Sequence, residues 1–174
     1  MFDFLFNPSG RISRKGYWIG FLLPYLALTE LAPRLLGGVP GMGVVFGLIA
    51  LFYLWPSVIA VPFKRMHDLG KSGWLYLGAM IVALVLIVAA VVMGAGQADG
   101  GFEGFAAQME SMPEDEVGMF MFELVMKSPA AMVMGAMASI IYFGFVIYLL
   151  FFPGQSGPNQ YGNDPLVGGR GFAD

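Results

Sequence analysis

The sequence contains no cysteine and has long stretches without any charged residue. The absence of cysteine excludes disulfide bonds, thiol nucleophiles and thiolate metal sites. Asp, Glu, Lys and Arg are all absent from residues 35–63, 72–98 and 128–163. Each stretch holds at least about 18 mostly apolar residues, enough for a helix to cross a hydrocarbon core roughly 30 Å thick. Because a charge costs about 2.5–3.5 kcal/mol at the bilayer centre, these absences predict a membrane protein.

The composition and a fourth apolar stretch support the same prediction. Charged residues make up 12% of the chain, whereas soluble proteins contain about 25%. The stretch 17–36 contains one acid, Glu30, and is too long for the apolar region of a signal peptide. We therefore expect an all-α fold: an integral membrane bundle of four transmembrane helices, forming a single domain over 1–174. The predicted spans cover 17–36, 42–63, 74–96 and 130–152, with a kink at Pro24 in the first.

Lys and Arg gather at the ends of the predicted spans on one side. Seven of the nine basic residues fall there: Arg11, Arg14, Lys15, Lys64, Arg65, Lys71 and Arg170. Because cytoplasmic loops carry an excess of Lys and Arg, this asymmetry predicts that both termini are cytoplasmic, with a tail over 154–174. The opposite side holds Arg34, Lys127 and most of the acidic residues.

The predicted outer loop, 97–128, contains the pattern of a helix start. Ser111 precedes Glu114 by three residues and Pro113 stands between them, as in the first turn of a capped helix. The acids that follow suit the positive end of a helix dipole, and the residues after them are rich in Met, Phe and Leu. We expect a short amphipathic helix on the outer membrane surface or packed over the bundle. The alternative is an extension of the fourth span, broken at Pro129.

Three polar stretches fall on the predicted cytoplasmic face: 10–18, 64–74 and 154–165. They contain the residues that we predict to form a recognition cluster or a structural cluster: Arg11, Arg14, Trp18, Arg65, His67, Asp68, Ser72, Trp74, Asn159 and Tyr161. Within this set, we expect Asp68 to pair with a nearby base, namely Arg11, Arg14 or Arg65. Such a pair would connect the loop after the second span to the N-terminal segment. Removing one member of a partly buried pair would leave the other charge unpaired, which costs more than the pair contributes.

These stretches resemble the motifs of the bacterial inner-membrane family named domain of unknown function 805 (DUF805). The resemblance rests on Gly10–Trp18, Arg65–Trp74 and Gly154–Pro165, and it extends over nearly the whole chain. The Arg-x-His-Asp-x-x-x-Ser-Gly-Trp pattern of the second stretch is the most specific. The resemblance implies a short four-span protein of the bacterial inner membrane, and it implies no established activity.

Neither a catalytic site nor a cofactor site is predicted. His67 is the single histidine, and a zinc site usually needs three or four protein ligands. Adjacent residues on a helix do not face one another, so His67, Asp68 and Ser72 would need a loop to meet as a catalytic set. The Gly-Lys-Ser sequence at 70–72 lacks the glycine that a phosphate-binding loop requires five positions earlier, where the chain has Arg65. We therefore expect no enzyme activity, no metal and no cofactor.

Glu30 and Arg34 are the ionisable residues nearest to membrane depth in the first span. Their i, i+4 spacing places them on one helix face in the favourable order, which predicts a satisfied pair close to the membrane exit. An acid within a span is otherwise a functional candidate. A small transporter or channel subunit is therefore an alternative function.

The basic residues beside interfacial aromatics suggest the principal hypothesis. Such clusters attract anionic lipid at about 1 kcal/mol per base, although bases at this place also serve only to set the topology. We hypothesise an inner-membrane protein that binds lipid headgroups, a protein partner or a second copy of itself through its cytoplasmic face. No nucleic-acid partner is expected, and a membrane-embedded enzyme is the least favoured alternative.

Overall fold

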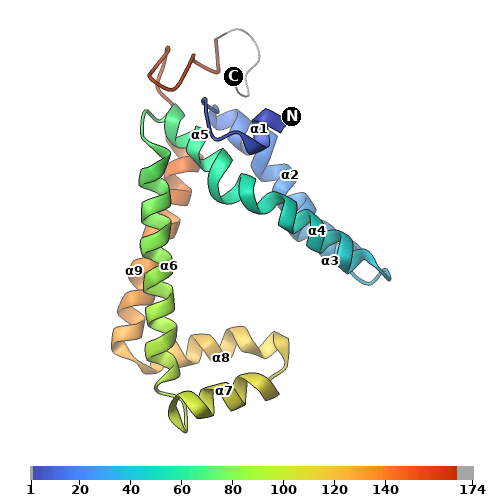
Figure 1. Ribbon diagram of the computed structural model, residues 1–174, viewed down its shortest axis with the longest axis vertical. Helices are drawn as coiled ribbons and strands as arrows, with labels where there is room; N and C mark the ends of the chain where they lie inside the picture. The colour runs from blue at the N-terminus through green and yellow to red at the C-terminus, as the bar shows by residue number, and fades with distance from the viewer. Residues whose placement is uncertain (1, 168–174) are drawn as a thin grey trace. The chain divides into compact units, whose positions relative to one another are not determined.

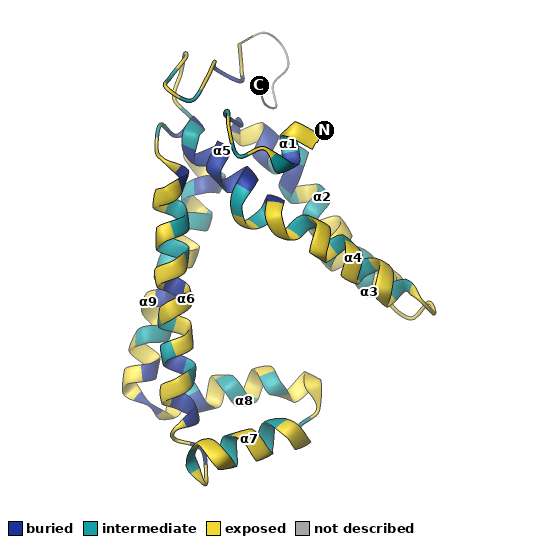
Figure 2. Ribbon diagram, in the orientation of Figure 1, coloured by how far each residue is buried: buried dark blue, intermediate teal, exposed yellow. Residues whose placement is uncertain are grey.

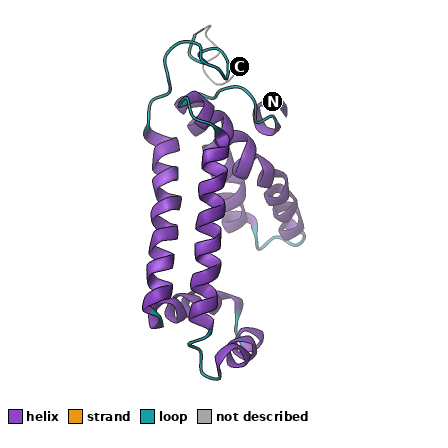
Figure 3. Cartoon of the chain, turned by 60° about the vertical axis from the view of Figure 1, so that its left-hand side comes forward, coloured by secondary structure: helices purple, strands orange, loops and turns teal. Residues whose placement is uncertain are grey.

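The computed structural model describes residues 2–167 (Figure 1). Its regular elements are helices joined by loops, followed by a non-helical tail (Figure 3). Within the described residues, four helices are long and apolar enough to cross a membrane: Gly16–Leu36, Met42–Asp68, Gly73–Ala95 and Pro129–Phe151. The prediction of an all-α chain with four helices of membrane-spanning length is confirmed. Arg170 and the end of the predicted tail lie outside the described residues.

The first two long helices consist of several labelled segments. After the short helix α1 (Phe2–Phe6), the first long helix contains α2 (Leu23–Leu26) and α3 (Ala32–Leu36), and the second contains α4 (Met42–Trp55) and α5 (Val61–Asp68). The other two are α6 (Gly73–Ala95) and α9 (Pro129–Phe151). The second long helix continues to Asp68 rather than ending at residue 63, because the polar side chains of its last turns are held by partners inside the protein. The motif residues 64–68 therefore lie on a helix and not in a loop.

Wider, π-helical turns occupy three segments of these two helices, Gly16–Leu22, Ala27–Leu31 and Pro56–Ala60. After each segment comes one residue and then a proline: Pro24, Pro33 or Pro62. Leu23, the residue before Pro24, donates its N–H to the carbonyl of Trp18, five residues earlier. In a regular α-helix the acceptor would be the carbonyl four residues earlier. A proline ring crowds the carbonyl four residues earlier and offers no N–H. The wider turn makes room for it, which is how the helix accommodates Pro24.

Two compact units make up the chain. The first combines the chain up to Leu77 with the chain from Val146 onward, and the second is Gly78–Phe145. The single domain expected over 1–174 stays a prediction.

In the first unit, aromatic side chains join the first two long helices. The ring of Tyr53 on α4 lies 6.3 Å from that of Phe21 and 5.7 Å from that of Tyr25, centroid to centroid. The turn between these helices contains Gly41, whose φ is 83°. That left-handed conformation is open to glycine and strained for most other residues.

In the second unit, two further helices lie between α6 and α9 along the chain. They are α7 (Gly101–Ser111) and α8 (Glu114–Lys127). Helix α8 begins where the sequence predicts a helix start, but Ser111 as its cap is wrong. Pro113 occupies the N-cap position, whereas Ser111 ends α7 and donates its hydroxyl to the carbonyl of Ala107 at 3.1 Å. Serine side chains often bond back to the preceding turn in this way.

Many large apolar side chains on the long helices are exposed (Figure 2). The large apolar side chains of Leu48, Leu84 and Ile140 are 63%, 60% and 72% exposed. By contrast, Arg11 and Arg65 have no exposed surface. Exposed apolar side chains along long helices are what a lipid environment accommodates, whereas buried charges require partners within the protein.

Candidate functional site

The predicted polar stretches meet around Asp68 at the end of α5. Arg11 donates to Oδ1 of Asp68 from Nε at 3.2 Å and from Nη2 at 3.0 Å. Arg65, one turn earlier on the same helix, donates from Nη1 to Oδ2 at 2.5 Å. Both arginine side chains are fully buried, and that of Asp68 is 4% exposed. We call these three residues the arginine–aspartate cluster; it contains two of the pairings that the sequence predicts for Asp68.

The cluster holds two positive charges against one negative charge, and backbone carbonyls accept further hydrogen bonds from it. Arg11 donates from Nη2 to the carbonyl of Gln155 at 2.5 Å and from Nη1 to that of Gly157 at 2.6 Å. Hydrogen bonds from a charged donor are about twice as strong as neutral ones. A buried guanidinium without such partners would be strongly unfavourable. Arg11 therefore binds the tail to α5.

The C-terminal end of α9 is held by side chains from the other two stretches. The last carbonyls of a helix have no partner within the helix. Here Arg65 Nε binds the carbonyl of Leu149 at 2.8 Å, Trp18 Nε1 that of Leu150 at 3.0 Å, and Arg14 Nη1 that of Phe151 at 3.1 Å. Arg65 also donates from Nη2 to the carbonyl of Phe152. The two arginines oppose the negative end of the helix dipole, so Arg14 caps α9 instead of pairing with Asp68.

The Gly-Lys-Ser sequence at 70–72 ends one helix and begins the next. Gly70 has a φ of 72°, and the N–H of Lys71 bonds to the carbonyl of Met66 at 2.9 Å. This is the Schellman arrangement, in which a left-handed glycine terminates a helix. The hydroxyl of Ser72 accepts the N–H at the second position of α6 at 3.3 Å, as a helix cap. The segment therefore supplies helix caps.

Tail residues cover the last turn of α5. The Tyr161 ring stacks on the His67 ring, with centroids 4.0 Å apart and planes 6° from parallel. Asn159 donates from Nδ2 to the His67 carbonyl at 3.0 Å. His67 Nδ1 lies 3.1 Å from the carbonyl of Gly10. Because a carbonyl oxygen only accepts, the geometry assigns the proton to Nδ1. One histidine thus joins the N-terminal stretch, α5 and the tail.

The start of the tail lies against Asp68. The N–H of Gln155 donates to the backbone carbonyl of Asp68 at 2.8 Å. A Cβ at Gly154 would lie 2.0 Å from Asp68 Oδ2. No side chain fits at that distance, so glycine is required at position 154.

His67, Asp68 and Ser72 engage separate partners. His67 bonds to the Gly10 carbonyl, Asp68 to the two arginines, and Ser72 to the N-terminus of α6. Among residues 2–167, no group of three or more His, Asp or Glu side chains could hold a metal ion.

The remaining predicted residues lie outside the cluster. Glu30 and Arg34 form the i, i+4 pair that their spacing predicts, at 3.3 Å, with side chains 55% and 77% exposed. The Trp74 ring packs edge-on against that of Phe63, with centroids 5.6 Å apart, and Trp74 is 71% exposed.

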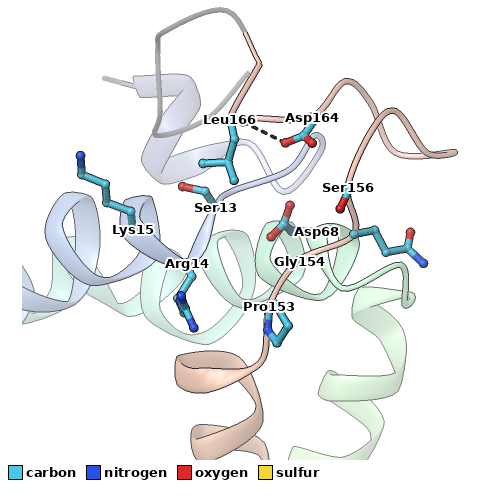
Figure 4. Close-up of a pocket in the computed structure, with 10 residues that line it drawn as sticks. Ser13, Arg14, Lys15, Asp68, Pro153, Gly154, Ser156, Asp164 and Leu166 are labelled. Atoms are coloured by element: carbon cyan, nitrogen blue, oxygen red, sulfur yellow. Dashed lines mark hydrogen bonds between the residues drawn. The ribbon is translucent and has the colours of Figure 1, made fainter.

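A pocket of about 330 Å³ adjoins the cluster, where the N-terminal stretch faces the tail (Figure 4). Its charged and hydroxyl lining residues are Ser13, Arg14, Lys15, Asp68, Ser156 and Asp164. The sequence analysis singled out Arg14 and Asp68 for the predicted cluster and Lys15 as one of the bases near the membrane, whereas it gave Ser13, Ser156 and Asp164 no individual role. Both ends of the chain and α5 contribute to it, so the pocket depends on the contacts described above.

Asp164 is the acidic residue that the tail brings to this pocket. Its oxygens accept the N–H groups of Gly157 at 2.8 Å and Leu166 at 2.9 Å. These two hydrogen bonds hold the pKa of its carboxyl below the ordinary value. The sequence offered one signal, because Asp164 is the single charged residue between 128 and 167. An isolated acid in a polar tail is a candidate for a specific contact.

Comparison with known families agrees with the resemblance of the three stretches. The family described as "Protein of unknown function (DUF805)" matches residues 5–163, which include every residue of the arginine–aspartate cluster. Neither a curated protein nor a solved structure matches the chain. This chain belongs to the DUF805 family of proteins of unknown function.

Proposed function

We propose that this protein is a multi-pass protein of the bacterial inner membrane that binds phosphate-bearing lipid headgroups at its cytoplasmic face and has no enzyme activity. In this proposal the four long helices cross the membrane as one bundle. The observation that carries the proposal is the pocket beside the end of α9, to which Arg14 and Lys15 contribute.

The contacts among the three stretches support the proposed topology. Segment 10–18, the end of α5 and the tail are hydrogen-bonded to one another, so they lie on one side of any membrane that the long helices cross. With four crossings, that side holds the N-terminal segment, the connection between the second and third spans, and the tail. The excess of Lys and Arg on that side favours the cytoplasm.

The four basic residues of the site divide into two kinds. Arg11 and Arg65 are fully buried against Asp68, and they hold the architecture. Arg14 and Lys15 line the pocket. A guanidinium has five N–H donors, so Arg14 can hold the Phe151 carbonyl and a ligand oxygen together. Arg14 and Lys15 are therefore the residues that we propose to bind the headgroup.

The level of the pocket relative to the proposed membrane also supports binding of a lipid headgroup. Arg14 binds the carbonyl of Phe151, the last residue of α9, and Pro153 lines the pocket. A ligand phosphate bound to Arg14 would therefore lie where the fourth span leaves the hydrocarbon. Lipid phosphates lie at that level, and juxtamembrane bases attract them there.

The test compares two double variants that remove equal charge. Arg14→Gln with Lys15→Gln should weaken retention of phosphatidylglycerol about 30-fold, since each base contributes about 1 kcal/mol and 1.4 kcal/mol is tenfold. The control, Arg34→Gln with Lys127→Gln, removes the bases of the proposed outer side and should change retention less than about threefold. Native mass spectrometry of the detergent-solubilised chain measures both. Equal retention by both variants would overturn the proposal and favour a protein partner.

The proposed absence of catalysis rests on the separate partners of His67, Asp68 and Ser72. A nucleophile and its base need to lie within hydrogen-bond reach of each other. Each of these side chains instead serves a helix end, an ion pair or a backbone carbonyl. That arrangement favours architecture over acid–base chemistry.

For the outer side, we propose that α8 lies on the membrane surface. Met119, Phe122 and Met126 are 64%, 61% and 48% exposed, and their spacing places them close together on the helix surface. Acids occupy the first turn of α8, at Glu114 to Glu116, where the helix dipole favours them. An apolar face with a charged end is typical of a helix in the interface plane.

A further inference from the structure

The pocket beside the arginine–aspartate cluster carries charges of both signs on two different segments. Arg14 and Lys15 belong to the N-terminal stretch, and Asp164 belongs to the tail. Figure 4 shows the Arg14 guanidinium next to Pro153 at the end of α9 and Asp164 on the far side of Asp68 from them, while the Lys15 side chain points away from that of Arg14. A ligand in this pocket would therefore meet positive charge at one end and negative charge at the other.

The negative charge at the far end comes from Asp164. Asp68 also lines the pocket, but both of its oxygens are bound by Arg11 and Arg65. Over the described part of the chain, the Asp164 carboxylate is held by two backbone N–H groups instead of by an ion pair. An ionised carboxylate accepts about four hydrogen bonds, so Asp164 keeps acceptor capacity for a ligand donor. Its pKa is lowered, so it is ionised at neutral pH.

We propose that this pocket binds a phosphoethanolamine group, with its phosphate at Arg14 and its primary ammonium at Asp164 and Ser156. The inference rests on the proposed function and names the ligand class of the same site. The volume of about 330 Å³ equals that of roughly eleven water molecules at about 30 Å³ each, which is ample for a phosphate joined to a two-carbon amine. An anionic headgroup without an amine offers the remaining acceptor positions of Asp164 no charged donor, and a quaternary choline offers that carboxylate no N–H donor.

The direction of the group follows from the position of α9. Arg14 holds the last carbonyl of that helix, so the phosphate end lies at the membrane. Asp164 belongs to the tail beyond the helix, so the amine end points away from the hydrocarbon. A phospholipid with an ethanolamine headgroup presents its phosphate and amine in this order. Free phosphoethanolamine shares the chemistry and is the second source to distinguish.

The experiment measures lipid retention by the full-length chain in detergent, using lipids with matched acyl chains. Phosphatidylethanolamine should be retained at least about tenfold more strongly than phosphatidylcholine or phosphatidylglycerol, because one charge-assisted hydrogen bond contributes about 1.5–3 kcal/mol and 1.4 kcal/mol is tenfold. Successive N-methylation of the headgroup should lower retention stepwise with the protein unchanged. Equal retention along the methylation series would overturn the inference.

Two variants test whether Asp164 is the source of the preference for phosphatidylethanolamine. Asp164→Asn should reduce retention of phosphatidylethanolamine to the level of phosphatidylglycerol, whereas Asp99→Asn, an acid of the second unit, should leave the preference intact. If Asp164→Asn keeps the preference, the inference is wrong. The methylation series on the unaltered chain gives a readout that does not depend on how this variant folds.

The same data separate the inference from the proposed function. If Arg14→Gln with Lys15→Gln weakens all lipids equally and no amine preference exists, headgroup binding stands and the ethanolamine assignment fails. If no lipid depends on Arg14 and Lys15, both fail. Competition by millimolar free phosphoethanolamine indicates a soluble ligand, and its failure to compete while the lipid preference persists indicates a lipid; each result agrees with the assigned chemistry.

Discussion

At residue 68, one carboxylate faces two guanidinium groups that have no contact with solvent. Among residues 2–167 it is the acidic side chain that forms an ion pair with each of them, and backbone carbonyls accept further hydrogen bonds from them. Because removing one member of a buried pair leaves the other charges uncompensated, such sites are sensitive to isosteric changes.

Asp68→Asn should lower the free energy of unfolding by about 3–5 kcal/mol, since it leaves Arg11 and Arg65 without their ion-pair partner in a buried site. Glu30→Gln is the matched control, because it removes one acid from an exposed pair, and its effect should stay within about 1 kcal/mol. Denaturant unfolding in mild detergent measures both variants. Similar losses of stability in the two variants would contradict the conclusion that Asp68 compensates the buried charges of Arg11 and Arg65.

Asp164 provides a pH-dependent contact at the same scale. Its pKa is lowered by the N–H groups of Leu166 and Gly157. A group with a lowered folded pKa contributes stability that is complete above its ordinary pKa, about 3.9, and is lost as the pH falls through the folded value.

The amide proton shifts of Gly157 and Leu166 should therefore titrate together, with a midpoint below about pH 3.9. NMR of the chain in detergent micelles measures both signals. The Asp164→Asn variant is the control and should show no such transition. A midpoint at or above the ordinary value would contradict the two hydrogen bonds.

At the scale of elements, the tail is an irregular segment that follows α9 and contacts the end of α5. It covers the end of α5 through Gln155 and Asn159, and its start follows the capped end of α9. Helix ends carry unpaired carbonyls, and near a membrane they need partners of this kind. The tail supplies them to α5, and the N-terminal stretch and Arg65 supply them to α9.

Gly154→Ala should release the tail, because the new Cβ would lie 2.0 Å from Asp68 Oδ2. We expect proteolysis within the tail to become about tenfold faster, in line with a loss of about 1.4 kcal/mol of local stability. Gly144→Ala on α9 is the matched control, since a Cβ there meets nothing within 4 Å. Equal cleavage rates in the two variants would contradict the docked tail.

The long helices could be predicted from the sequence more readily than the residues that contact one another. The long helices follow from the absence of charge, which is a local property of each stretch. Asp68 is a plausible partner for any nearby arginine, so sequence alone left Arg11, Arg14 and Arg65 as equal choices. Arg14 takes a helix-end carbonyl instead, and every helix offers such carbonyls, so no sequence pattern singles out that of Phe151. Ser111 shows the same difficulty, because a serine caps the following helix or bonds back to the preceding one.

At the scale of the whole molecule, the distribution of buried groups is what a lipid solvent requires. Many apolar side chains of the long helices are exposed, and the arginine–aspartate cluster is buried with its hydrogen bonds made inside the protein. Residues at the two ends of the chain contact the same helix end. In the proposed four-span topology, this contact places segment 10–18, the α5–α6 connection and the start of the tail on one side of the membrane.

Impermeant thiol labelling tests that claim most directly, because the chain has no cysteine and each introduced cysteine is the single reactive site. Ser9→Cys, Lys71→Cys and Ser156→Cys place a thiol in the N-terminal segment, the α5–α6 connection and the tail, and Gly38→Cys places one in the turn after the first span; all four positions are exposed. In intact cells, only the Gly38→Cys variant should be labelled, and the other three should react after lysis. Labelling of Ser156→Cys from outside, together with Gly38→Cys, would contradict the account.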